Sequence, residues 1–214
     1  MRYLRVDFAF AVNPRWLVNR AASGFITIVI LLLLLHNVAF ARMQLSLRES
    51  TLPPVAHTLF CISYPGECAE AAGTASFLSA PVQALYTSLE VVNRDVNAAI
   101  RPVHAKERNI VADRWLLSPL SGNCNDYAVS KRHELLRLGW PSWALLLAEV
   151  VVATGEHHLV LVANAGGESF VLDNLKETVV PLAAAVDYHW IRIESPDDPR
   201  FWIAFSPNER LPAR

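Results

Sequence analysis

Three residue types that together perform nucleophilic catalysis occur in the order Cys124, His158 and Asp173. Cys124 stands in the segment Gly-Asn-Cys-Asn-Asp-Tyr-Ala, where the pattern turns helical. A thiol at a helix N-terminus faces unpaired backbone N–H groups and the positive end of the helix dipole, and a nearby imidazole lowers its pKa further. This order therefore predicts a cysteine nucleophile, a histidine base and an aspartate that orients the base.

Each of these residues also has a structural interpretation. A lone cysteine at a helix start is more often a small buried apolar residue than a catalyst. His158 fits a half-buried strand histidine, and Asp173-Asn174 fits a turn that closes a strand. The joint placement of the three residues favours catalysis over the separate structural roles.

The segment after Cys124 predicts a surface helix with one buried face, which ends at Gly139 before Trp140-Pro141. Its apolar positions are Ala128, Val129, Leu135, Leu136 and Leu138, and the charged or polar residues between them are Lys131, Arg132, His133, Glu134 and Arg137. Asn123 or Asn125 can cap the helix, so Cys124 is expected in the cap or the first turn.

Apolar runs separated by turn residues predict five strands. They cover residues 144–153, 158–163, 169–173, 188–193 and 201–205. A hairpin with the two-residue loop Ala165-Gly166 would place His158 directly opposite Asp173 on one face of the sheet. A register change of one residue would place the two side chains on opposite faces and remove the triad.

A second amphipathic helix is predicted from Pro81 to Ile100, with apolar residues at spacings of three and four. Its central polar residues are Asn93, Arg94, Asp95 and Asn97. We expect these four side chains on a solvated helix face rather than in contact with the site.

Contacts to the oxyanion and the cleft have several candidates. Residues 112–119 read as a loop that lines the cleft, and the indole N–H of Trp115 could reach an oxyanion, although packing is the favoured role for this side chain. Asn123 is a further cleft candidate. The backbone N–H of Cys124 is the more secure oxyanion donor because it lies at a helix N-terminus.

Several spaced motifs closely resemble the bacterial transglutaminase-like cysteine proteinases, over roughly residues 57–205. These motifs are Gly-x-Cys-x-Asp-Tyr-Ala with Lys131-Arg132, Gly139-Trp140-Pro141, His158-x-Val160-Leu161, Val171-Leu172-Asp173-Asn174 and Ser195-Pro196-Asp197-Asp198-Pro199 with Trp202. The resemblance implies an α+β, papain/transglutaminase-like fold, in which the nucleophile-bearing helix packs on an antiparallel sheet of about five strands. It also implies the roles of nucleophile for Cys124, base for His158 and orienter for Asp173.

The LapG-like periplasmic proteases are the best-known branch of this family, and resemblance to them implies calcium dependence through acidic residues around the cysteine. This chain carries Asn123 and Asn125 where those relatives commonly carry Asp and Glu. Two carboxylates fewer disfavour a hard cation. We therefore expect no required cofactor. No metal site is predicted, since His157 and His158 point to opposite faces of a strand.

The N-terminus has the features of a signal peptide over residues 1–41. Four arginines precede the apolar run Phe25 to Leu35, and Ala39-Phe40-Ala41 is a small-x-small cleavage site. Residues 42–214 then form a single domain that is periplasmic or secreted. The alternative is an uncleaved anchor in the inner membrane facing the periplasm, because Phe25 to Ala41 spans 17 residues.

Charge and cysteine content fit export. Without residues 1–41, 15 basic and 19 acidic residues remain, and no basic stripe indicates a nucleic-acid partner. Cys61 and Cys68 flank the turn-forming Tyr64-Pro65-Gly66, so we expect a disulfide between them in an oxidising compartment. In the alternative interpretation all three cysteines are reduced and the chain is cytosolic.

The function predicted from these features is that of an exported cysteine peptidase. It would cleave a protein of the bacterial envelope or surface through a thioester acyl-enzyme. The alternatives are an amide-bond transferase or isopeptidase on the same triad, and a catalytically inert binding module. Membrane contact is expected only through the N-terminal segment, if that segment is not cleaved.

Overall fold

The computed structural model describes residues 50–69, 80–103 and 114–204. These residues belong to one compact unit, Glu49–Arg214. The predicted signal segment, residues 1–41, lies outside the described residues. In the part of the chain that is described, no helix has both the length and the apolar character needed to cross a bilayer.

A seven-stranded antiparallel sheet forms the centre of this unit, in the strand order β1-β9-β8-β4-β5-β6-β7. The strands are β1 (Ser50–Thr51), β4 (Leu145–Val151), β5 (His157–Ala165), β6 (Glu168–Leu172), β7 (Val180–Pro181), β8 (His189–Glu194) and β9 (Trp202–Ala204). All five predicted strands are present. The two additional strands, β1 and β7, have two residues each and lie at the sheet edges. A separate parallel pair joins β2 (Arg101–Pro102) to β3 (Ser121–Gly122).

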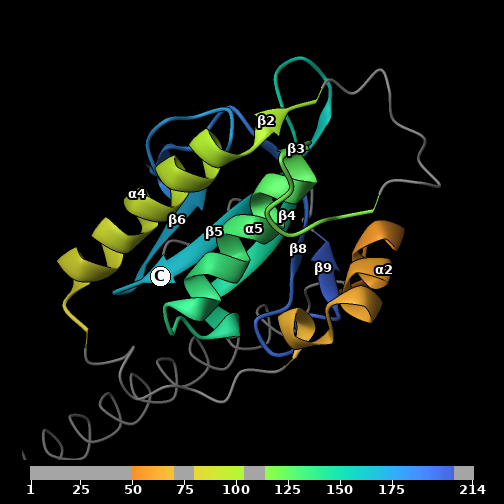
Figure 1. Ribbon diagram of the computed structural model, residues 1–214, viewed down its shortest axis with the longest axis horizontal. Helices are drawn as coiled ribbons and strands as arrows, with labels where there is room; N and C mark the ends of the chain where they lie inside the picture. Colours follow the sequence, from red (N-terminus) through yellow and green to blue (C-terminus); the bar gives the residue numbers. More distant parts are fainter. Residues whose placement is uncertain (1–49, 70–79, 104–113, 205–214) are drawn as a thin grey trace, which may run out of the picture. The chain divides into compact units, whose positions relative to one another are not determined.

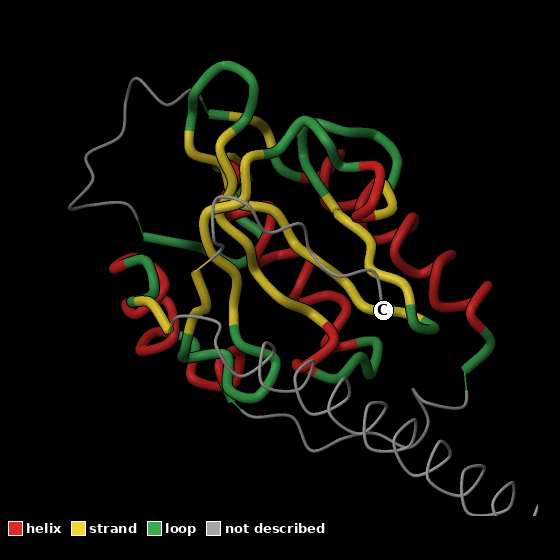
Figure 2. Tube along the Cα trace, turned by 180° about the vertical axis from the view of Figure 1, so that it is seen from behind, coloured by secondary structure: helices red, strands yellow, loops and turns green. Residues whose placement is uncertain are grey.

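Two helices cover one face of the sheet. They are α4 (Val82–Ala99) and α5 (Cys124–Arg137), and Figures 1 and 2 show both on the same side of the strands. The remaining helical elements are α2 (Val55–Ser63) and the 3-10 turns η1 (Pro65–Cys68), η3 (Ser142–Ala144) and η4 (Leu182–Ala184). Since α5 packs on β4 and β5, the predicted α+β arrangement of a nucleophile-bearing helix on an antiparallel sheet is confirmed.

Both faces of the central strands are buried. Leu145, Leu147 and Leu161 join the apolar cluster beneath α4 and α5, whereas Leu146 and Val160 belong to a second cluster on the opposite face. Burial on two sides explains why these strands read as continuous apolar runs rather than as alternating patterns.

The nucleophile-bearing helix begins and ends close to the predicted positions. Asn123 caps it, and it ends at Arg137 before Gly139, whose φ of 90° suits only glycine. The expectation that its charged residues are solvated is wrong for Lys131 and Arg132, which are buried. Contacts with α4 and with the sheet enclose more of this helix than one amphipathic face.

The predicted loop of the hairpin between β5 and β6 is wrong by one residue. Ala165 pairs with Glu168, so the two-residue loop is Gly166-Gly167, with φ values of 60° and 87°. This turn type needs positive φ at both central positions, which Ala165 tolerates poorly. The ladder extended past Leu172 would place Asp173 opposite Val160. The residue opposite Asp173 thus differs from the predicted one by two positions along β5. Because side chains alternate between faces, His158 and Asp173 still lie on the same face.

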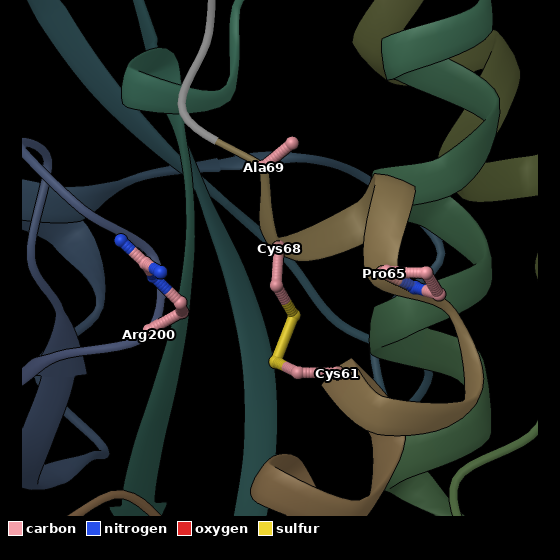
Figure 3. Close-up of a pocket in the computed structure, with 5 residues that line it drawn as sticks. All are labelled: Cys61, Pro65, Cys68, Ala69 and Arg200. Carbon is pink, nitrogen blue, oxygen red and sulfur yellow. A yellow bond between two sulfur atoms is a disulfide. The ribbon is translucent and has the colours of Figure 1, made fainter.

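The predicted disulfide between Cys61 and Cys68 is confirmed and joins α2 to η1. Figure 3 shows this bond beside Arg200 in a pocket of about 360 Å³. Pro65 and Ala69 complete the lining. The pocket contains none of the three predicted catalytic side chains.

Candidate active site

Cys124 is the first residue of α5, in the turn where the helix dipole acts most strongly. A capping box fixes this turn. The side-chain oxygen of Asn123 accepts the backbone N–H of Asn125 at 2.9 Å, and the Asp126 carboxylate accepts the N–H of Asn123 at 2.9 Å. The backbone around the sulfur is therefore held from both sides, and Asn123 acts as the cap.

Asp126 also ties the preceding loop to the helix. Its other carboxylate oxygen accepts the backbone N–H of Leu116 at 2.8 Å. A Cβ on Gly122 would lie 2.6 Å from an Asp126 oxygen, so only glycine fits beside this carboxylate. This role of Asp126 was not predicted, although an acidic residue three positions after Asn123 is the signature of a capping box.

His158 lies at the start of β5, beyond the last residue pair of the β5–β6 ladder. Its Nε2 donates to an Asp173 carboxylate oxygen at 2.6 Å. A side-chain hydrogen bond also joins His158 to Cys124. Since Nε2 is committed to Asp173, Nδ1 is the ring nitrogen left for the sulfur.

Opposite charges fix the protonation state of this pair. Burial alone would lower the pKa of His158, but the hydrogen bonds and negative charges of Asp173 and Cys124 outweigh burial and raise it to about 9. Burial alone would raise the pKa of Asp173. The hydrogen bond and the charge interaction with His158 outweigh burial, so the pKa of Asp173 lies below its ordinary value. At neutral pH the pair is an imidazolium and a carboxylate.

Further donors hold Asp173 in place. The Tyr188 hydroxyl donates to its second carboxylate oxygen at 2.5 Å, and the backbone N–H of Leu175 donates to the first at 2.9 Å. Burial and the negative charge of Asp173 raise the pKa of Tyr188, so this hydroxyl remains a donor. Tyr188 was not predicted as a site residue, because it is 15 residues from Asp173 in the chain and reaches the carboxylate only in the folded sheet.

The expectation of a fully solvated polar face on α4 is wrong for two of the four residues. Asn97 donates to the backbone oxygen of Asp173 at 3.1 Å. Asn93 is buried and donates to the backbone oxygens of Lys176 and Glu177. A spacing of four residues places both amides beside the buried stripe. The other two, Arg94 and Asp95, are exposed and pair with each other.

Trp115 packs in the core, as the favoured interpretation predicted. Its ring lies edge-on to His57, with centroids 5.6 Å apart, and 6.1 Å from the ring of Phe60. Its indole nitrogen is buried and has no hydrogen-bond partner among the described residues. A contact from Trp115 to an oxyanion stays a prediction.

The family model for bacterial transglutaminase-like cysteine proteinases matches residues 47–210. The chain belongs to this family. Its family is one of cysteine proteinases, a class whose substrates are proteins.

Solved structures of Legionella pneumophila LapG are similar to this chain. The calcium-bound form has 23% identity and a TM-score of 0.48, and the match covers 64% of this chain and 76% of LapG. A second LapG structure has 24% identity and a TM-score of 0.46, covering 59% and 71%. The EGTA-treated form has 23% identity and a TM-score of 0.47, covering 61% and 72%. No curated protein matches this chain.

The expectation that no cofactor is required is contradicted, because a calcium-bound protein is among these similar structures. That expectation considered only carboxylates as calcium ligands. Calcium takes six to eight oxygen ligands, including amide and backbone carbonyl oxygens and water, so replacing Asp and Glu by Asn123 and Asn125 does not exclude it.

The residues beside Cys124 nevertheless fit a calcium ion poorly. Asp126 is the only carboxylate in the segment from Gly122 to Tyr127, and both of its oxygens already accept backbone N–H groups. The side-chain oxygen of Asn123 is likewise engaged in the cap.

Proposed function

We propose that this chain is a cysteine peptidase with Cys124 as nucleophile, His158 as base and Asp173 as orienting carboxylate. One observation carries the proposal. His158 is hydrogen-bonded to a buried carboxylate on one side and to a helix-start thiol on the other. This arrangement of nucleophile, base and orienter is the general geometry of covalent acyl transfer. We call these three residues the candidate triad.

The resting form of the candidate triad is a thiolate–imidazolium pair. The proton sits on His158, because the pKa of this residue is raised to about 9 by the negative charges of Asp173 and Cys124, against the effect of burial. Asp173 stays ionised and fixes the ring orientation through Nε2. A nucleophilic sulfur and a proton ready for transfer are thus present together near neutral pH.

In the first half-reaction the Cys124 thiolate attacks the carbonyl carbon of a peptide bond, and the electron pair of the C=O moves to its oxygen. The backbone N–H of Cys124, at the N-terminus of α5, donates to the oxyanion. The tetrahedral intermediate collapses to a thioester. His158 gives its proton to the departing amine.

In the second half-reaction His158, now neutral, accepts a proton from water as the water oxygen attacks the thioester carbon. Collapse of this intermediate breaks the C–S bond, releases the carboxylic acid and restores the thiolate–imidazolium pair. Asp173 keeps one ring orientation through both steps, supported by Tyr188 and Leu175.

The proposal includes export through residues 1–41 and a protein of the cell envelope as substrate. Support comes from the signal-like N-terminus and from the disulfide between Cys61 and Cys68, a bond typical of oxidising compartments. N-terminal sequencing of the protein recovered from both the periplasmic and the membrane fraction of bacteria tests this part. A mature chain beginning at Arg42 supports cleavage, and one that keeps residues 1–41 supports the membrane anchor.

Similarity to calcium-bound LapG brings calcium into the proposal. With Asp126 as the single carboxylate in the segment from Gly122 to Tyr127, we expect this chain to bind calcium weakly, with a Kd on the order of 10⁻⁴ M.

Alkylation of Cys124 by iodoacetamide at pH 6 to 7 tests the candidate triad without a known substrate. The other two cysteines are joined in a disulfide, so labelling reports on Cys124 alone. We expect rapid labelling that is lost in His158→Ala and retained in His157→Ala, which removes an exposed neighbouring imidazole. Labelling as slow as that of an unfolded thiol, or unaffected by His158→Ala, would favour the inert binding module.

A further inference from the structure

Lys131 is buried in α5 in a way that its sequence position does not suggest. Its side chain has 0% exposure, and its ammonium nitrogen has no hydrogen-bond partner among the described residues. A lysine is rarely fully buried unless it is paired, because removing its charge from water is unfavourable. The fold retains this unfavourable burial in the helix that carries the candidate nucleophile.

The position of Lys131 directs its charge toward the candidate triad. It follows Cys124 by seven residues, close to two helical turns, so both lie on the same side of α5. Helical side chains lean toward the N-terminus, which brings the lysine stem toward the sulfur end of the helix. The charged group that acts on Lys131 is Asp173, whose negative charge favours the ammonium form.

Neutral amide side chains lie beside Asp173 and the residues that follow it. The side-chain oxygens of Asn93, Asn97 and Asn174 are buried and have no hydrogen-bond partner in the described ranges. Asn97 donates to the backbone oxygen of Asp173, and Asn174 follows Asp173 in the chain. A lysine ammonium offers three donors and these amides offer acceptors, a combination that buried water commonly bridges. The α4 side chains that hydrogen-bond to residues 173–177 are the neutral amides Asn93 and Asn97.

Charge balance gives Lys131 a role. The reactive form of the candidate triad holds a thiolate, an imidazolium and a carboxylate, with a net charge of −1. One ammonium brings the buried cluster to neutrality. We propose, on the basis of the function proposed above, that Lys131 is a positioning residue whose buried ammonium stabilises the ionised Asp173 and so the reactive form of the candidate triad.

If Lys131 had a purely structural role, its replacement would lower the stability of the fold. The electrostatics of Lys131 predict the opposite. Burial lowers the pKa of Lys131 to about 7, although the charge of Asp173 opposes this shift. The folded state therefore binds this proton less tightly than the unfolded state, and stability rises with pH between about 7 and 10.5. Methionine has a similar length and no charge. Lys131→Met is therefore expected to melt at the same or a higher temperature than the wild type at pH 6, while its thiol is less reactive.

The test is the rate of Cys124 alkylation by iodoacetamide between pH 4 and pH 10, in the full chain. In Lys131→Met we expect the acid limb of the profile to move up by about one pH unit, because loss of a nearby positive charge raises the pKa of the thiolate and carboxylate cluster. Above about pH 8 the wild-type lysine is neutral, so the two profiles should meet. Arg137→Met, which removes an exposed cation from the same helix, should leave the profile unchanged.

The double variant Asp173→Asn/Lys131→Met tests whether the effect passes through Asp173. We expect Lys131→Met to add no further shift to that of Asp173→Asn, since coupled residues are not additive. An equal shift in both backgrounds would overturn the proposal. The proposal would also be overturned if Lys131→Met left the acid limb of the alkylation profile unmoved. The same holds if this variant slowed alkylation equally at all pH values and lowered the melting temperature. Lys131→Gln, with the same expected shift, replaces Lys131→Met if that variant does not fold.

Failure of this inference is distinguishable from failure of the proposed function. If the candidate triad is not catalytic, wild-type Cys124 reacts like an ordinary thiol and His158→Ala changes nothing. If only the role of Lys131 is wrong, wild-type Cys124 reacts rapidly, His158→Ala abolishes this, and Lys131→Met keeps the wild-type profile.

Discussion

Among the described residues, two buried histidine–carboxylate pairs lie beside sulfur atoms. In the first, His158 donates to Asp173 at 2.6 Å and is bonded to Cys124. In the second, Nε2 of His57 lies 2.9 Å from a carboxylate oxygen of Glu194, and the sulfur of Cys61 lies 3.7–3.8 Å from the two ring nitrogens of His57. A cysteine, a histidine and a carboxylate therefore meet twice.

The state and position of the sulfur distinguish the two sites. Cys124 keeps its thiol and stands at the N-terminus of α5, whereas Cys61 is bonded to Cys68 and stands near the C-terminal end of α2. A sulfur in a disulfide cannot act as a thiolate nucleophile, and a helix C-terminus would not stabilise its negative charge.

Glu194 gives the second site a structural role. Its other oxygen accepts the backbone N–H of Leu147 at 2.8 Å and lies 3.7 Å from Nε of Arg132. The second pair thus joins α2, β8, β4 and α5 in the core, while the first leaves its sulfur at a helix start. Residue types alone do not define a catalytic site. The helix-start thiol does.

Replacing the histidine of the first pair should give the largest functional effect. We expect His158→Ala to lower peptidase turnover by about 10³-fold or more, because the general base is lost. Its raised pKa also means that this histidine contributes stability that is present below about pH 6.5 and lost as pH rises through about 9. Melting temperatures across this range should depend less on pH in the variant. Unchanged turnover would place the chemistry elsewhere.

Replacing the histidine of the second pair should act on stability instead. His57→Ala removes the partner of one oxygen of the buried Glu194 carboxylate, and we expect a loss of about 3–5 kcal/mol in the free energy of unfolding, measured with urea. The folded fraction should keep the wild-type rate of Cys124 alkylation. His157→Ala is the matched control with an exposed imidazole, and equal stability of the two variants would contradict the structural role of the second pair.

Gly122→Ala should have an intermediate effect on the first site. The new Cβ would lie 2.6 Å from the Asp126 carboxylate, so the capping box and the bond to Leu116 must shift. We expect a loss of about 1–2 kcal/mol, typical of a broken helix cap, together with slower alkylation of Cys124. Gly66→Ala is the control, since open space surrounds that position. Identical behaviour of the two variants would show that the cap does not hold the sulfur.

The smallest expected effect concerns calcium. Asn125→Glu adds a carboxylate beside Cys124, so calcium should bind more tightly, and alkylation without calcium should slow because a negative charge disfavours the thiolate. Asn125→Gln keeps the length without the charge. Calorimetric titration with and without EGTA compares the three proteins, and equal calcium affinity in all of them would remove position 125 from any calcium site.

The first site and most of the elements that carry it could be predicted from the sequence because the relevant signals are local. The apolar periods, the turn glycines and the residues around Cys124 predicted α5, the five main strands and the placement of His158 and Asp173 on one face. The disulfide spans only seven positions around a turn. Local propensity and pattern determine such features.

Other features depend on contacts between distant parts of the chain. His57 and Glu194 are 137 positions apart, and the bond from Asn97 to Asp173 spans 76. Nothing in a helical period shows that Lys131 is buried rather than solvated. The predicted register of the hairpin was wrong for a different reason. Both loop residues need a positive φ, and this requirement outweighed the apolar pattern.

Titration of the His158 ring by NMR, in the wild type and in Cys124→Ala, tests the central claim most directly. The account predicts that wild-type His158 stays protonated through neutral pH and titrates near pH 9, and that removal of the sulfur lowers this value. An ordinary value of about 6.5 in the wild type, unchanged in Cys124→Ala, would contradict the thiolate–imidazolium pair and with it the assignment of the candidate triad.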